Sequence, residues 1–170
     1  GIASIGVFSG KWYVEFKRTD ATTIHLFGIV ADNFVSDGVT VSNNSGNHNF
    51  GIEHTGTLFL KTTNSSQDIF LDGSDTNTNV DFTTTSNDII MVAFDADSKK
   101  IWFGKNGTWS SSGDPAGGSN PSDTYDGTGS APFFFAAGTE NTQAIQGNFG
   151  NPAFAISSSN ADGRGYGNFE

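Results

Sequence analysis

Short runs of alternating hydrophobic and polar residues, separated by turn-forming residues, recur along the chain. Over residues 12–17 the even positions are all hydrophobic, whereas the odd positions carry Tyr13, Glu15 and Lys17. A period of two places these sets on opposite faces of a strand, so the run predicts a strand with one face in a core. A second apolar run covers residues 24–30, and the short loop 19–22 predicts that the two runs form a hairpin.

The clearest pattern covers residues 88–107. Residues 89–94 are apolar at every position, which is typical of a central strand covered on both faces. A turn follows over residues 95–99, then an aromatic strand returns over residues 100–104. The pair Asn106-Gly107 is a strong turn signal.

The remaining runs are short and lie between Gly-, Ser-, Thr- and Asn-rich segments. We expect strands in the ranges 50–61 (two strands around 54–56), 69–71, 80–82, 131–137 and 142–149. Long loops are expected over 32–49 and 110–130, and residues 157–170 are expected to be irregular. Many short strands with turn signals between them favour a β-sandwich.

Composition and charge narrow this picture. Sixteen Phe, three Trp and three Tyr suit half-buried strands, and 170 residues suit one domain. Eighteen acidic residues against eight basic ones give a net charge of -10, which argues against binding nucleic acid or an anionic membrane. The chain has no Cys, so disulfides and thiolate metal sites are excluded. No apolar run is long enough to predict a membrane-spanning segment.

Four motifs in order between residues 10 and 155 resemble those of the SPRY domain. Residues 10–16 resemble the early strand of that family, and residues 27–30 resemble the strand that follows it. Residues 88–107 resemble the family's most typical hairpin, in which a hydrophobic strand ends in Asp and an aromatic strand returns into an Asn-Gly turn. Residues 132–135 and 148–150 resemble the late Pro-x-aromatic strand and the closing Asn-Phe-Gly.

This resemblance implies an all-β fold, an antiparallel β-sandwich of the SPRY, concanavalin-like jelly-roll type. It implies one SPRY-like domain over residues 1–170, with a core of about 10–155 and a Gly/Ser-rich C-terminal tail over 157–170. The insertion 110–115 and the ending 163–170 are similar to SPRY-like domains of phage and other viral structural proteins. Because the chain starts without Met, we expect it to be a piece of a longer polypeptide or a processed form.

The viral resemblance implies a non-catalytic binding module on a virion surface, as part of a fibre, a tail or a capsid decoration protein. Its partners would be other virion proteins and a glycan or protein of the host surface, with no nucleic acid and no membrane insertion. We expect folding in the host cytoplasm and an extracellular location after release. A purely structural or assembly domain, including a homo-oligomer, and a glycan hydrolase are the alternatives.

The residues themselves favour binding over catalysis. A glycoside hydrolase needs two carboxylates on either side of the scissile bond, but the four Glu lie far apart in the sequence. Asp95 and Asp97 lie two positions apart, yet they fall in a predicted turn, where Asp is common. No Ser lies in a Gly-x-Ser-x-Gly context. We therefore expect no catalytic residue and no cofactor.

Ligand contacts are expected from the rim loops, because strands form a scaffold and loops carry recognition. Aromatic rings stack on apolar surfaces while amides and carboxylates bind polar groups. The candidate ligand-binding residues are Asp37, His48, Asn49, Asn64, Trp109, Asp114 and Tyr125. In the alternative interpretation, the non-core aromatics, including Tyr13 and Phe134, cover the second face of a sheet or an oligomer interface.

Metal binding has only limited support from the sequence. Asp72 and Asp75 are the best candidates for Ca²⁺ ligands, because Ca²⁺ takes carboxylate and carbonyl oxygens. The segment around them matches no complete calcium loop, and an ordinary solvated loop explains it as well. The three His lack the close spacing of a zinc pair.

Overall fold

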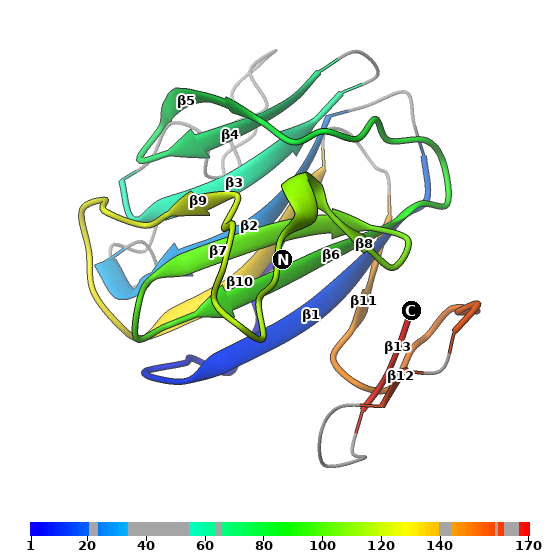
Figure 1. The fold of residues 1–170 in the computed structure, drawn as a ribbon. Helices are drawn as coiled ribbons and strands as arrows, with labels where there is room; N and C mark the ends of the chain where they lie inside the picture. Colours follow the sequence, from blue (N-terminus) through cyan, green and yellow to red (C-terminus); the bar gives the residue numbers. More distant parts are fainter. Residues whose placement is uncertain (21–23, 34–54, 64–65, 140–143, 159, 162–166) are drawn as a thin grey trace.

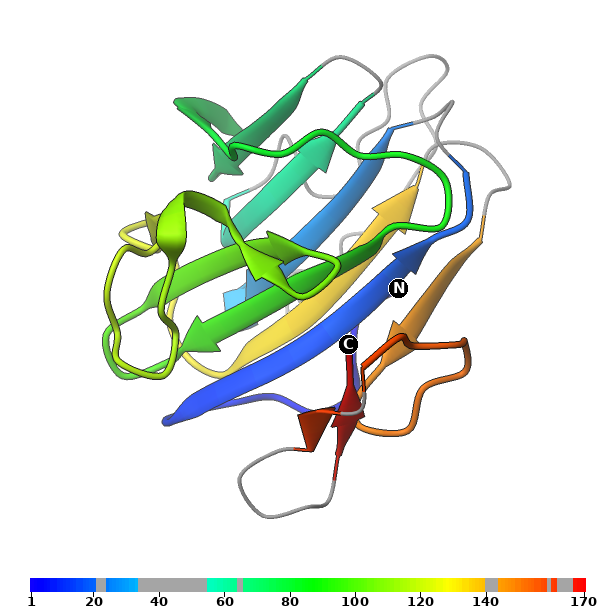
Figure 2. The ribbon, with the colours of Figure 1, turned by 45° about the vertical axis from the view of Figure 1, so that its right-hand side comes forward.

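The computed structural model describes residues 1–20, 24–33, 55–63, 66–139, 144–158, 160–161 and 167–170. Two antiparallel sheets lie face to face (Figures 1 and 2). The first sheet has the order β11 (Ile145–Asn148), β1 (Lys11–Arg18), β6 (Ile89–Asp95), β7 (Lys100–Lys105) and β8 (Thr108–Trp109), with β9 (Asp123–Thr124) also paired to β7. The second has the order β10 (Phe133–Thr139), β2 (His25–Ala31), β3 (Thr57–Thr62), β4 (Gln67–Leu71) and β5 (Ser74–Asn79). The predicted antiparallel β-sandwich is confirmed.

The predicted hairpin over residues 88–107 is also confirmed. Strands β6 and β7 pair from Ile90 with Lys105 to Asp95 with Lys100. Residues 89–94 are buried at every position, as expected for a strand covered on both faces. Asn106 and Gly107 have φ values of 47° and 81°, the left-handed conformation that an Asn-Gly hairpin turn requires.

The predicted hairpin between the first two strands is wrong. Strand β1 pairs with β6 and β11 in the first sheet, whereas β2 pairs with β10 and β3 in the second. The chain therefore crosses from one layer to the other between Arg18 and His25. The core-facing sides of both strands meet across the sandwich, where the Phe16 and Phe27 rings stack with centroids 5.7 Å apart.

Two further strand predictions need correction. The strand expected at 80–82 does not form, because Val80 instead packs into the core after β5 has ended at Asn79. The tail expected to be irregular contains a ribbon, in which β12 (Asn160–Ala161) pairs with β13 (Asn168–Phe169). The strand expected in the first part of 50–61 and the loop 34–49 lie outside the described residues.

The main core fills the space between the two sheets with side chains from both. A second cluster, formed by Leu26, Val30, Phe59 and Ala136, lies on the outer face of the second sheet, and Phe134 packs against it. The outer face of the first sheet differs, because residues of β1, β6 and β7 that point away from the core line a pocket there.

Candidate functional site: an aromatic pocket on the first sheet

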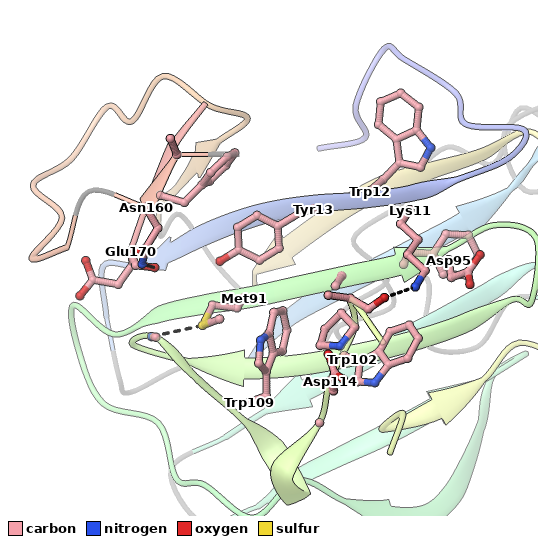
Figure 3. A pocket seen from close by; sticks show the side chains of 18 residues that line it. Lys11, Trp12, Tyr13, Met91, Asp95, Trp102, Trp109, Asp114, Asn160 and Glu170 are labelled. Carbon is pink, nitrogen blue, oxygen red and sulfur yellow. Dashed lines mark hydrogen bonds between the residues drawn. The ribbon is translucent and has the colours of Figure 1, made fainter. Parts of the chain in front are cut away.

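A pocket of about 460 Å³ lies on the outer face of the first sheet. Strands β1, β6 and β7 form its floor, and β8 and the loop 113–116 form one side. The ribbon β12–β13 forms the opposite side (Figure 3). The pocket thus combines segments from most of the length of the chain.

The hollow follows from strand register. Tyr13 is paired with Ala93, and Ala93 with Trp102, so a small side chain lies between two rings in one row across the sheet. In the next row Met91 is paired with Gly104, and Gly104 with Trp109. A Cβ atom on Gly104 would lie 2.7 Å from the Thr108 carbonyl oxygen and 3.0 Å from the Trp109 ring. Small residues between large ones therefore create the concave surface.

The Tyr13 ring contacts two other rings of the pocket; Figure 3 labels Tyr13 and Trp109. The Tyr13 ring contacts Trp109 edge to face at a centroid distance of 5.8 Å, and contacts Phe169 in the same manner at 4.9 Å. Such edge-to-face pairs contribute about 0.5–1.5 kcal/mol beyond their buried area. Trp102 is only 1% exposed, and its indole N–H donates to the Ser119 carbonyl at 2.8 Å, which ties the loop to the floor.

A buried carboxylate holds the ribbon against the sheet. Glu15 Oε1 accepts hydrogen bonds from the Tyr13 hydroxyl at 2.6 Å and from the Glu170 backbone N–H at 2.8 Å. Its Oε2 accepts one from Asn148 Nδ2 at 2.8 Å, and the same amide donates to the Asn168 carbonyl. Burial and the contact with Glu15 raise the pKa of Tyr13, so this hydroxyl stays protonated and remains a donor. We call these groups the Glu15 network.

The charged groups of the pocket are mainly acidic. Asp95, Asp114 and Glu170 line it, against one cation, Lys11, which donates to the Ala116 carbonyl. Burial alone would raise the pKa of Asp95 and Glu170, but hydrogen bonds from nearby Ser residues hold both below their usual values. Both carboxylates are therefore ionised at neutral pH.

Two of the sequence-predicted binding residues, Trp109 and Asp114, line the pocket, but their role in binding stays a prediction. The expectation that Tyr125 lies on the rim is wrong. Its side chain is 1% exposed, packs edge to face on Phe133, and donates its hydroxyl to the Thr128 carbonyl at 2.7 Å. The other candidates, Asp37, His48, Asn49 and Asn64, lie outside the described residues.

The two calcium candidates have structural roles in this fold. The Asp72 carboxylate accepts hydrogen bonds from the backbone N–H groups of Gly56, Thr57 and Thr128, and so joins two loops. Asp75 accepts one from the N–H of Asn77 within its own turn. Among the described residues, no group of three or more His, Asp or Glu side chains lies close enough to hold a metal ion.

The hairpin turn that contains Asp95 and Asp97 was predicted correctly. Asp95 Oδ1 accepts hydrogen bonds from the N–H groups of Asp97 and Ser98. The pattern also placed Tyr13 and Glu15 on the outward face. Met91, Trp102 and Phe169 were missed as pocket residues, because the pocket forms only when β1 and the β12–β13 ribbon, both distant in sequence, lie beside the β6–β7 hairpin. None of the described helices is long and apolar enough to cross a membrane.

Comparison with known proteins supports the fold. No protein family profile matches the chain, and no curated protein matches it by sequence. Among solved structures, the SPRY domain of human HERC1 superposes with a TM-score of 0.51 at 18% sequence identity. The match covers 85% of this chain and 76% of that domain. The chain therefore has a β-sandwich similar in fold to a SPRY domain.

Proposed function

We propose that this chain is a non-catalytic binding module that holds a segment of another protein in the aromatic pocket. The observation that carries this proposal is the pocket itself, a concave, ring-lined hollow of about 460 Å³ on the outer face of a sheet. Ligand sites are typically concave and mostly apolar, with a few polar groups that fix orientation. The Tyr13, Trp109 and Phe169 rings supply the apolar surface, and the carboxylates supply the polar groups.

The state of the carboxylates favours binding over hydrolysis. Glu15 is fully buried and accepts hydrogen bonds from three donors of the chain. Asp95 and Asp114 accept hydrogen bonds from backbone N–H groups of their own turns, and Glu170 accepts from Ser157. A glycosidase needs one carboxyl group as a proton donor and a second as a nucleophile or base. Hydrogen bonds hold the pKa of Asp95 and of Glu170 below the usual values, so neither carboxyl group suits the role of proton donor.

The hydrogen bonds of the pocket favour a protein segment over a glycan. The indole N–H groups of Trp102 and Trp12 donate to backbone carbonyls, and the Asn160 amide donates to Ser158 and Glu170. A sugar hydroxyl that accepts a hydrogen bond needs a donor, and these three side-chain donors are already used. Rings and Met91 suit apolar parts of side chains, as at the centre of protein interfaces.

The virion-surface location and a host-surface partner remain hypotheses that rest on the sequence resemblance to viral SPRY-like domains. Within this hypothesis, the partner segment belongs to a host-surface protein or to another virion protein. A purely structural role would make the pocket a contact between fixed parts of an assembly. The pocket supports either case, because both require a protein segment bound at the same rings.

The experiment is a peptide-array screen with the 170-residue chain, with a glycan array run in parallel. The affinity of each peptide that binds the wild type is then measured for the Trp109→Ala variant. Phe8→Ala is the control, because it removes a 69%-exposed ring outside the pocket. We expect Trp109→Ala to weaken binding at least about tenfold and Phe8→Ala to leave it unchanged. Binding to glycans alone, or peptide binding that is equal in both variants, contradicts the proposal.

A further inference from the structure

We infer that the segment bound in the aromatic pocket is basic, with an Arg or Lys side chain inserted against the Tyr13 and Trp109 rings. This inference rests on the proposed function and specifies the chemistry of the partner. Its three supports are the charge of the pocket, the lack of a Lys or Arg over its three rings within the described residues, and the shape of its floor.

The charge of the pocket is complementary to a cation. Three acidic residues, Asp95, Asp114 and Glu170, line the pocket against one cation, Lys11, which lies close enough to Asp95 to help lower the pKa of that carboxyl group. Lys11 is held by a hydrogen bond to the Ala116 carbonyl, whereas Tyr13 and Glu170 lie away from it, toward the other end of the pocket (Figure 3). The whole chain carries a net charge of -10, so its long-range field attracts a basic partner and repels an acidic one.

The rings of the pocket are without a cation of their own. Elsewhere in the described chain three lysines lie over aromatic rings, with Lys17 over Phe154, Lys61 over Phe70 and Lys99 over Tyr125, at 5.2–5.9 Å from the ring centroids. Within the described ranges, no Lys or Arg lies over Tyr13, Trp109 or Phe169. Trp and Tyr bind cations on their faces, and the attraction grows when the pair is shielded from water.

The floor suits the methylene stem of such a side chain. Arg and Lys bury their stems along apolar surface while the charged head reaches polar groups. The floor offers Met91, the small Ala93 and the ring of Trp102. A stem lying in this hollow would place its charged head among the rings. The negative net charge of the chain would repel an acidic side chain in the same position.

The test uses an array of peptides of matched length with equal numbers of basic, neutral and acidic sequences. The probe is the tightest-binding peptide whose affinity falls in the Trp109→Ala variant. A neutral version of the same peptide is then made, with Arg replaced by citrulline and Lys by norleucine. We expect the basic peptides to be enriched and the neutral replacement to weaken binding at least about tenfold. Raising the salt concentration should weaken binding of the basic peptide further.

Variants of the chain test the rim. Asp114→Asn should weaken the basic peptide about two- to fivefold, and Asp126→Asn, an exposed carboxylate outside the pocket, should leave it unchanged. Circular dichroism of each variant reports whether the fold is retained. If neutral or acidic peptides bind through Trp109, the inference fails and the proposed function stands. If no peptide depends on Trp109, the proposed function fails as well.

Discussion

The Glu15 network makes a quantitative prediction about stability. Glu15 is fully buried on the outer face of β1, yet it joins Tyr13, Asn148 and Glu170, which belong to three different parts of the chain. Replacing Glu15 by Gln keeps the size of the side chain and one acceptor oxygen. That oxygen can still accept from Tyr13 and from the Glu170 N–H. The new amide then faces the Asn148 amide, so two donors oppose each other.

Asn148 cannot relieve this by turning its amide, because Oδ1 already accepts from the Gly150 N–H at 2.9 Å and Nδ2 also donates to the Asn168 carbonyl. One hydrogen bond to a charged acceptor is lost, which costs about 1.5–3 kcal/mol. In a chain of 170 residues, about 2 kcal/mol corresponds to a melting temperature lower by roughly 4–8 °C. Glu15→Ala would remove the acceptor for all three donors and should cost about 3–5 kcal/mol.

The assay is urea unfolding at pH 7 followed by Trp fluorescence, with Asp126→Asn as the control for removing one negative charge. We expect the control to stay within about 0.5 kcal/mol of wild type. Limited proteolysis of Glu15→Gln should cut the C-terminal residues faster than in wild type, since Asn148, which also holds the Asn168 carbonyl, loses its hydrogen bond to Glu15. If the free energy of unfolding of Glu15→Gln equals that of the control, the network does not stabilise the fold as described.

Three further predictions concern other parts of the sandwich. Gly28→Ala should lower the free energy of unfolding by about 3 kcal/mol, because its Cβ would lie 2.0 Å from the Leu58 carbonyl oxygen. The control, Gly107→Ala, has φ +81° and open space around the new Cβ, so it should cost only about 1 kcal/mol. Equal costs in urea unfolding would argue against the clash at Gly28. Asp72→Ala should lower the free energy of unfolding by about 2 kcal/mol, because the hydrogen bonds that join two loops are lost. Millimolar Ca²⁺ should leave the melting temperature of wild type unchanged. A rise with Ca²⁺ in wild type that the variant lacks would show a metal site instead. Hydrogen bonds from the Ser111 backbone N–H and the Ser110 hydroxyl lower the pKa of Asp81 from its usual value, so its stabilisation is present above about pH 4 and is lost as the pH falls through the folded pKa. The difference in free energy of unfolding between wild type and Asp81→Asn should therefore shrink from pH 6 to pH 3, and a constant difference would contradict this assignment.

Sequence reasoning succeeded where the information was local. The hairpin of β6 and β7 could be predicted because both partners are neighbours and the Asn106-Gly107 turn carries its own conformational signal. The alternation over residues 12–17 correctly placed Val14 and Phe16 in the core. Trp12 belongs to the same alternating set as Val14 and Phe16 but is 45% exposed. It lies near the start of the strand, where the core no longer covers that face.

Sequence reasoning failed where tertiary pairing decides the outcome. A period of two identifies a core face but does not say which sheet a strand joins, so β1 and β2 were wrongly paired. Strand β5 contains only Ser, Asp, Thr and Asn, and its pairing with β4 gives it a strand conformation without an apolar residue. Tyr125 lies in a polar loop, yet its ring fills space beside Phe133. Neither feature has a signal in its own segment.

The pocket is the strongest case of this limit. Its depth depends on Ala93 and Gly104, two small residues that become meaningful only when register places each beside a large ring. Its far wall depends on Phe169 and Glu170, which reach β1 through a contact with Glu15 that spans 155 positions. A motif search finds residues that are close in sequence, whereas this site is made by residues that are close only across strands. The most informative positions for function are therefore the outward-facing ones. A strand face that points away from the core is expected to be polar and exposed, and the aromatic Tyr13 and the buried Glu15 depart from that expectation on β1.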